Sequence, residues 1–169
     1  LMRRPEFSGM QRQNSLGIAF PGLVEHVLGR FGSPGITYDT EMEAGNIFPG
    51  VVIPGRSTTP RIDLLARKKG VPVAVISAKW SLRHDRLSDI IQECPVYKEV
   101  AFRIHRWRIK YFVVTNEFDP SRLGKLVTDP CLDGLVHVHK PAVTHVCRLD
   151  LRLERMMDLS QLFEVTHNW

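Results

Sequence analysis

The sequence lacks the long apolar segments that a membrane protein needs. No stretch approaches the roughly 20 consecutive apolar residues that are required to cross a bilayer. The N-terminal run LMRRPEFSGMQRQNS also lacks the apolar core of a signal peptide. We therefore expect a cytoplasmic protein.

Cysteine is scarce. The three cysteines, Cys94, Cys131 and Cys147, are odd in number and form no CxxC pair. This pattern argues against a disulfide framework and against a four-cysteine zinc site. The sequence thus predicts three reduced thiols, most of them buried.

The composition is that of an ordinary globular domain. The chain has 169 residues, of which 43% are hydrophobic and 24% charged, and we find no internal repeat or linker. A chain of this length buries a substantial core, so we expect a single domain over 1–169. Lysine and arginine total 23 against 18 acidic residues, a formal charge of +5. This excess suits a polyanionic partner, although many basic proteins bind no nucleic acid.

The pattern along the chain predicts a mixture of helices and strands. Apolar spacing predicts helices, and short apolar runs between turn residues predict strands. The stretch FPGVVIPGRSTTP predicts a loop because it is rich in Pro, Gly and Thr. Helices are expected at 16–31, from 87 onward until Pro95 ends, kinks or restarts the helix before 96–106, at 120–127 and at 149–163. Strands are expected at 61–67 and 71–80, joined by a hairpin turn at Lys68-Lys69-Gly70, and at 109–115 and 134–138.

Two carboxylates and a lysine are candidates for phosphodiester hydrolysis, which needs a cation and an oriented water. Ser77 and Lys79 lie two residues apart on a strand and so share a face. If the turn pairs Arg67 with Val71, Asp63 lies opposite Val75 and shares that face as well. The alternative is that these are ordinary solvated charges of a hairpin.

Glu93 is the second acid of this set. It lies three residues after Ile90, at the edge of the apolar face of the predicted helix. From this edge its side chain can extend toward the sheet. Carboxylate oxygens are suitable ligands for a hard cation. The alternative interpretation of Glu93 is a surface charge.

The segment KWSLRHDRLSDIIQE, from Lys79 to Glu93, resembles type II restriction endonucleases of the PD-(D/E)XK superfamily. In the branch that reads CCGG or CCNGG cores, the second acid of the motif is replaced, giving S-x-K with a glutamate further on. Ser77-Ala78-Lys79 and Glu93 reproduce this arrangement. The sequence departs from the family in having Ile62, not proline, before Asp63, and a shorter gap from Asp63 to Lys79 than several relatives.

The same branch carries R-x-D-R just after the lysine, and Arg83-His84-Asp85-Arg86 matches it. Arginine can donate two hydrogen bonds to guanine, and aspartate can accept one from cytosine, in the major groove. The alternative is a charged helix N-terminus in which Asp85 is a cap.

The resemblance implies a restriction-endonuclease-like α/β (α+β) core, with a mixed central sheet flanked by helices, in a prokaryotic-type protein. It also implies Mg²⁺ as cofactor and double-stranded DNA as partner. Asp63 and Glu93 would hold Mg²⁺, Lys79 would orient the attacking water, and cleavage would leave a 5′-phosphate. An acid on the first helix often joins the metal shell in this family, and Glu25 is the candidate, with a surface glutamate as the alternative. A palindromic site favours a homodimer, and a monomer that acts twice is the alternative.

Other residues have weaker patterns. Basic side chains that are candidates for phosphate contacts are Arg56, Arg61, Arg103 and Arg106. His137, His139, His145 and Cys147 fit no strong zinc motif, and ordinary strand histidines are the alternative.

Three functions follow from these patterns. The first is a Mg²⁺-dependent type II restriction endonuclease that reads a CCGG or CCNGG type of site. The second is a structure-specific repair or recombination nuclease of the same superfamily, which needs no R-x-D-R reader. The third is a DNA-binding module without activity, because Ser77 occupies a position where an acid is common.

Overall fold

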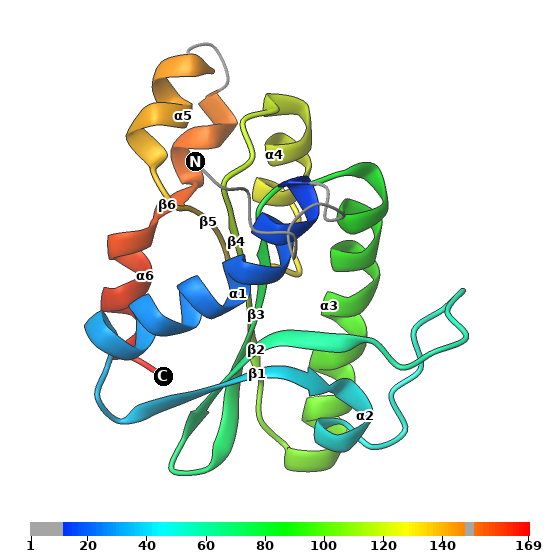
Figure 1. The fold of residues 1–169 in the computed structure, drawn as a ribbon. Helices are drawn as coiled ribbons and strands as arrows, with labels where there is room; N and C mark the ends of the chain where they lie inside the picture. The colour runs from blue at the N-terminus through cyan, green and yellow to red at the C-terminus, as the bar shows by residue number, and fades with distance from the viewer. Residues whose placement is uncertain (1–11, 148–150) are drawn as a thin grey trace, which may run out of the picture.

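The computed structural model describes residues 12–147 and 151–169, which form one six-stranded sheet with the strands in chain order (Figure 1). β1, β2 and β3 pair antiparallel, whereas β4, β5 and β6 continue from β3 in parallel. The mixed sheet agrees with the predicted α/β class. The strands are β1 (Ile36–Glu43), β2 (Arg61–Lys68), β3 (Val71–Lys79), β4 (Lys110–Thr115), β5 (Gly134–His137) and β6 (Met157–Asp158).

Helices cover both faces of this sheet (Figure 1). α1 (Arg12–Phe31) and α6 (Leu159–Thr166) pack on one face through a cluster that includes Phe20, Val24 and Leu162. α3 (His84–His105) and α4 (Pro120–Val127) pack on the other face. The remaining helices are short: α2 (Ala44–Ile47), α5 (Lys140–Val146) and the 3₁₀ helix η2 (Leu151–Arg155).

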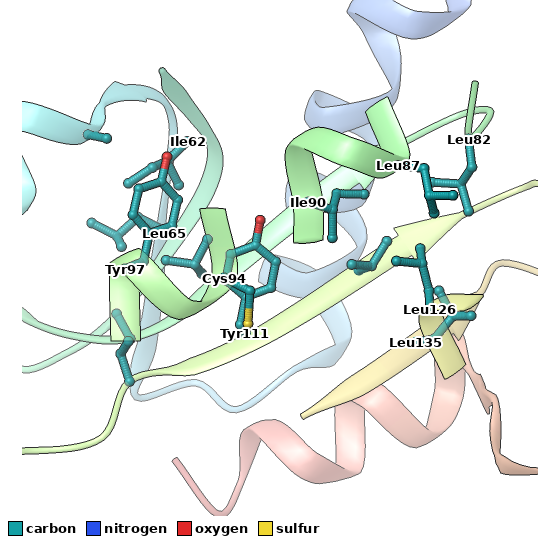
Figure 2. Close-up of a cluster of buried hydrophobic side chains, with 14 of the residues drawn as sticks. Ile62, Leu65, Leu82, Leu87, Ile90, Cys94, Tyr97, Tyr111, Leu126 and Leu135 are labelled. Atoms are coloured by element: carbon teal, nitrogen blue, oxygen red, sulfur yellow. The ribbon is translucent and has the colours of Figure 1, made fainter. Parts of the chain in front are cut away.

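The long helix α3 buries one apolar face against the sheet, as its spacing predicts. Figure 2 shows Ile90 and Tyr97 from this helix in the cluster with Leu65 and Tyr111 of the sheet. The helix is continuous through Pro95, so Pro95 does not end it.

The hairpin of β2 and β3 is confirmed, but its register differs from the predicted one. The turn has two residues, Lys69 and Gly70, with φ values of 51° and 81°, as a type I′ turn requires. Lys68 therefore pairs with Val71, and the register shifts between Ala66 and Arg67. Leu64 pairs with Ile76, which places Asp63 opposite Ser77 and not opposite Val75.

The expectation of three reduced cysteines is wrong. Cys94 of α3 and Cys131, in the loop between α4 and β5, form a disulfide. Sequence spacing could not reveal this pair, because the two residues lie 37 positions apart and meet only when α3 packs on the sheet. Cys147 is half-buried, and its thiol donates to the carbonyl of Phe118 at 3.4 Å.

The C-terminal region differs from the single helix expected at 149–163. Residues 149 and 150 lie outside the described residues, and η2, β6 and α6 follow them. The side chain of Asp158 accepts from the backbone N–H of Ser160 and forms a capping box with Gln161, so a new helix begins here. Among the described residues, no helix is both long and apolar enough to cross a membrane.

Candidate active site

Asp63, Ser77 and Lys79 converge at the end of the hairpin, as the strand pattern predicts. Lys79 Nζ lies 2.8 Å from Oδ1 and 2.7 Å from Oδ2 of Asp63. Ser77 Oγ and the backbone N–H of Ala78 donate to Oδ2 at 3.2 and 2.9 Å. The side chains of Asp63 and Lys79 are 12% and 19% exposed, so the pair is partly shielded from water but still reachable.

Glu93 reaches the sheet from the middle of α3. Tyr111 on β4 donates its hydroxyl to Glu93 Oε2 at 3.5 Å. Burial raises the pKa of Glu93 to about 7, against the positive charges of Arg56 and Lys79, and the charges of Asp89 and Asp63 raise it further. Among these causes the charge of Asp63 is the smallest, and a cation near both carboxylates would oppose its effect on the pKa of Glu93.

Arg56 belongs to this cluster, although the sequence suggested only a phosphate contact for it. Its Nη1 donates to Glu93 Oε1 at 2.8 Å, and its Nη2 forms an ion pair with Asp89. The loop after α2 therefore supplies a guanidinium that compensates two acids of α3. No pattern in the sequence signalled this contact, because the loop has no regular register with α3.

An open cavity of about 320 Å³ gives access to the Asp63–Lys79 pair. Its walls come from the start of α1, from β1 and from the start of α3. They bring a further acid, Glu41, and the arginine Arg86 to the same cavity. The lining residues are Gly17, Ile18, Pro21, Glu41, Asp63, Ala78, Lys79 and Arg86. We call this cavity the hairpin cleft.

The R-x-D-R segment begins α3 beside the hairpin cleft. Arg83 and Asp85 are 64% and 62% exposed and form an ion pair at 3.1 Å. Arg86 lines the cleft itself. Arg83, Asp85 and Arg86 are thus accessible from outside the protein, as side chains that contact DNA bases must be.

Glu117 fixes the segment that joins β3 to α3. Its Oε2 accepts from the backbone N–H of Leu82 at 2.8 Å, and its Oε1 accepts from the N–H groups of Phe118 and Asp119. Burial opposes ionisation, but these donors and Arg122 lower the pKa of Glu117. Sequence reasoning missed this residue. Its position at the end of a strand, before the helix start Asp119-Pro120, was the available signal.

Glu25 does not reach the hairpin cleft. The part of α1 that lines the cleft ends at Pro21, one helical turn before Glu25. The carboxylate of Glu25 instead lies near Gly29, with Oε1 3.9 Å from the point where a β-carbon at that glycine would be. The structure therefore gives no support to Glu25 as a member of the site.

The other basic candidates separate into two groups. Arg61 is exposed, on β2, and its Nη1 lies 4.0 Å from Glu41 Oε2 at the hairpin cleft. Arg103 and Arg106 lie at the far end of α3, about 30 Å from Arg83 at 1.5 Å per helical residue. The structure thus brings Arg61, but not the latter two, near the candidate site.

The histidines have structural contacts. His137 Nε2 lies 3.0 Å from the carbonyl of Glu117, and its Nδ1 accepts from the backbone N–H of His139. His139 Nδ1 accepts from the N–H of Ala142 and caps α5, on which His145 lies. Within 12–147 and 151–169, no group of three or more His, Cys, Asp or Glu side chains could hold a metal ion.

The donor set of the candidate site fits Mg²⁺ better than zinc. Asp63 and Glu93 offer carboxylate oxygens from β2 and α3. Mg²⁺ is commonly held by one or two carboxylates and keeps several waters, whereas a zinc site needs more nitrogen or sulfur ligands. Asp63 lines the open hairpin cleft, whereas Glu93 is not among its lining residues. A Mg²⁺ site at these two residues stays a prediction.

Comparison with known proteins supports the fold. No protein-family model and no curated protein matches the sequence. Among solved structures, the chain is similar to "Restriction endonuclease PspGI-substrate DNA complex", with a TM-score of 0.57 and 11% sequence identity. The likeness covers 93% of this chain and 62% of that chain. The chain therefore has a restriction-endonuclease-like fold, as the segment from Lys79 to Glu93 implied.

Proposed function

We propose that this protein is a Mg²⁺-dependent endonuclease that cuts double-stranded DNA, and that it acts as a type II restriction endonuclease. The observation that carries the proposal is the Asp63–Lys79 pair, which lies in an open cleft within a restriction-endonuclease-like fold and whose charges act on the pKa of Glu93. The structural neighbour is described as a complex with substrate DNA. We extend that partner to this chain as part of the proposal.

The roles of the residues follow from their contacts. Asp63 and Glu93 would hold Mg²⁺, which when bound neutralises charge that develops on the cleaved phosphate. Ser77 and the N–H of Ala78 fix the carboxylate of Asp63 through Oδ2. Lys79 contacts Asp63 through its ammonium group, from which it can orient the attacking water. The water would attack the phosphorus and the P–O3′ bond would break, which leaves a 3′-hydroxyl and a 5′-phosphate.

Base reading is assigned to the start of α3. Arg83, Asp85 and Arg86 suit G·C pairs, because arginine donates to guanine and aspartate accepts from cytosine. Arg86 lines the same cleft as Asp63, which supports a proposed reading segment beside the proposed cutting site. We propose a CCGG or CCNGG core on this basis and on the R-x-D-R resemblance.

Cleavage of a plasmid that contains CCGG and CCNGG sites tests the proposed function. The protein is incubated with it in Mg²⁺ and in EDTA, and the ends of any fragments are sequenced. Discrete fragments that need Mg²⁺ and carry 5′-phosphates at such sites are expected. A smear or cuts at branched structures would support a structure-specific nuclease instead. Tight binding in Ca²⁺ without cleavage in Mg²⁺ would identify an inactive DNA-binding module.

Substitution in the reader tests the assignment of specificity. Arg83→Ala should weaken discrimination at one base pair by about 1–3 kcal/mol, because a bidentate arginine contact contributes that much. Cleavage of oligonucleotide duplexes with single changes in the core measures this discrimination. Arg103→Ala is the matched control, since Arg103 lies at the far end of the same helix. Equal effects of the two substitutions would contradict the assignment.

A further inference from the structure

The end of α3 and its connection to β4 are rich in cations. The segment RIHRWRIK, from Arg103 to Lys110, contains four arginine and lysine residues and no acid. Arg103, Arg106, Arg108 and Lys110 are all exposed. Within the part of the chain that the structure describes, Lys110 is the one of these four that forms an ion pair. The three arginines therefore keep their charges available to an anionic ligand.

An open cavity lies beside this segment, and we call it the α3–β4 cavity. Its volume of about 450 Å³ lies within the range of small-molecule and cofactor sites. Arg108 lines it, and its two acids are Glu99 and Asp133. The charge of Asp133 is compensated, because Lys98 and Lys110 form ion pairs with it. Glu99 balances one further cation, so the arginines around the cavity leave its rim positive.

Phe102 is the aromatic side chain of the α3–β4 cavity. It is 50% exposed and belongs to neither core cluster, although it lies on the same helix as the fully buried Tyr97 and Ala101. An aromatic ring gains most from burial, so a half-exposed phenylalanine adds little to the stability of the fold. A ligand that covers the ring would account for its position beside a cavity.

A second aromatic surface lies one helical turn further on. His105 and Trp107 stack, with ring centroids 4.5 Å apart and an interplanar angle of 15°. Trp107 Nε1 donates to the carbonyl of Pro72 at 3.1 Å, which fixes the stack against the start of β3. Phe102 and His105 are three residues apart on α3 and so share a helix face. Aromatic rings and cations are thus interleaved over one surface.

This combination fits single-stranded nucleic acid better than a duplex. A single strand offers phosphates to cations and the faces of its bases to aromatic side chains. In a duplex the base faces are covered by neighbouring base pairs, so a duplex would contact the arginines and leave Phe102 without a partner.

We propose that the α3–β4 cavity binds single-stranded nucleic acid, with a base stacked on Phe102 and a phosphate bound by Arg108. This site is separate from the hairpin cleft, because Phe102 and Arg86 lie on the same helix about 24 Å apart along its axis. The inference goes beyond the proposed function and does not rest on it, since no residue of the hairpin cleft takes part.

Binding of a labelled strand in EDTA tests the inference without reference to cleavage. An oligothymidylate of about 12 nucleotides is titrated with the protein, and its fluorescence anisotropy is measured. Phe102→Ala should weaken binding about 5- to 150-fold, as loss of one base–aromatic stack does. Phe102→Tyr, which keeps a ring, should bind as the wild type does. Phe31→Ala is the matched control, because Phe31 is 61% exposed at the end of another helix, α1.

The dependence of binding on salt tests the phosphate contact. Arg108→Ala should reduce the slope of log K against log salt concentration by about 0.7, the value for one phosphate contact with a single strand. Arg30→Ala, which removes an exposed cation next to Phe31, should leave the slope unchanged. An oligouridylate of the same length, measured in parallel, shows whether DNA or RNA is the better ligand.

Several outcomes would overturn the inference. A wild type that binds no strand would do so, as would equal losses in Phe102→Ala and Phe31→Ala. Duplex binding with the same dependence on Phe102 would also contradict base stacking. Binding that polyglutamate mimics and that Phe102→Ala leaves unchanged would identify a general polyanion surface instead. Thermal unfolding of each variant verifies folding, and Arg108→Ala provides a second test if Phe102→Ala is unstable.

The outcomes also separate this inference from the proposed function. Strand binding that depends on Phe102, in a protein that cuts no plasmid, supports the inference and contradicts the nuclease. Site-specific cleavage by a protein that binds no single strand supports the nuclease and overturns the inference.

Discussion

Two lysine–aspartate pairs of similar exposure lie in different parts of this protein. Lys79 and Asp63 are 19% and 12% exposed, and Lys98 and Asp133 are 29% and 20% exposed. Each pair lines an open cavity, of about 320 Å³ for the first and about 450 Å³ for the second. Exposure and ion pairing therefore do not identify a functional site.

The surroundings of the two pairs differ. Asp133 accepts from the backbone N–H of Tyr111 at 2.8 Å and from Lys110, and Lys98 also donates to the carbonyl of Cys131. These contacts join a loop to a strand and a helix, next to the disulfide. Asp63, by contrast, lies among other ionisable side chains of the hairpin cleft. Both aspartates accept from a backbone N–H, and the two pairs differ in their other neighbours. Glu41 and Arg86 line the cavity of Asp63 and Lys79, whereas Lys98 donates to the carbonyl of Cys131.

The largest expected effect comes from exchanging the two lysines for alanine. Lys79→Ala should lower Mg²⁺-dependent cleavage by about 10³-fold or more, because a charged group that acts at the reacting phosphate is lost. Lys98→Ala should leave cleavage unchanged and lower the melting temperature instead. Plasmid cleavage rates and thermal unfolding of both variants measure these effects. Equal cleavage by the two variants would remove the distinction between the pairs.

The disulfide beside Lys98 should contribute to stability and not to cleavage. Cys94 and Cys131 close a loop with a separation of 37 residues. Such a loop corresponds to about 3–4 kcal/mol of unfolding free energy from the restricted unfolded chain. Replacing both cysteines by alanine should therefore lower the denaturant midpoint strongly, with cleavage at 25 °C retained. Cys147→Ala, which keeps the disulfide, is the control, and a loss of cleavage in a folded double variant would contradict the prediction.

Asp133→Asn should destabilise the protein by about 2 kcal/mol. The substitution removes the negative partner of Lys98 and Lys110 and leaves the half-buried Lys98 beside the exposed Lys110. Urea unfolding followed by circular dichroism measures the change. The cleavage rate at saturating Mg²⁺ should stay that of the wild type, and a parallel loss of cleavage would show that the second pair supports the site.

The smallest effect is a pH dependence of stability. Burial opposes ionisation of Asp133, but hydrogen bonds from Lys98 and Tyr111 lower its pKa below the ordinary value of 3.8. Its contribution is therefore fully present above about pH 4 and is lost as the pH falls through the lowered pKa. Unfolding at pH 6 and pH 3 should show a smaller decrease in Asp133→Asn than in the wild type. An equal decrease would assign the acid sensitivity to other carboxylates.

The sequence predicted those parts of the fold that depend on local patterns. α4 has the expected bounds, and the hairpin and α3 follow from turn residues and apolar spacing. The sequence predicted that Asp63, Ser77 and Lys79 converge, although it gave Asp63 the wrong partner on β3. The expected partner Val75 and the observed partner Ser77 lie two residues apart on the same face of β3, so the error did not move Asp63 to the other face.

What the sequence did not predict depends on contacts between distant segments. The Cys94–Cys131 bond, the Arg56–Glu93 ion pair and the hydrogen bond from Leu82 to Glu117 each join parts of the chain that meet only in the folded state. The positive φ of Glu41 within β1 was also missed, because a positive φ within a strand has no reliable signal in a residue other than glycine or asparagine. The C-terminal helix was wrong because apolar spacing alone did not show that a strand pairs at Met157.

The continuity of α3 couples the positions of Arg86 and Glu93. Arg86 and Glu93 lie on one unbroken helix, seven residues apart, so they keep a constant separation and rotation. Inserting one residue between them would turn Glu93 by about 100° around the helix axis, away from Tyr111 and Arg56. Under the proposed function, a changed recognition sequence would therefore have to come from exchanging side chains at positions 83–86, because a change of length would separate the proposed reading residues from Glu93.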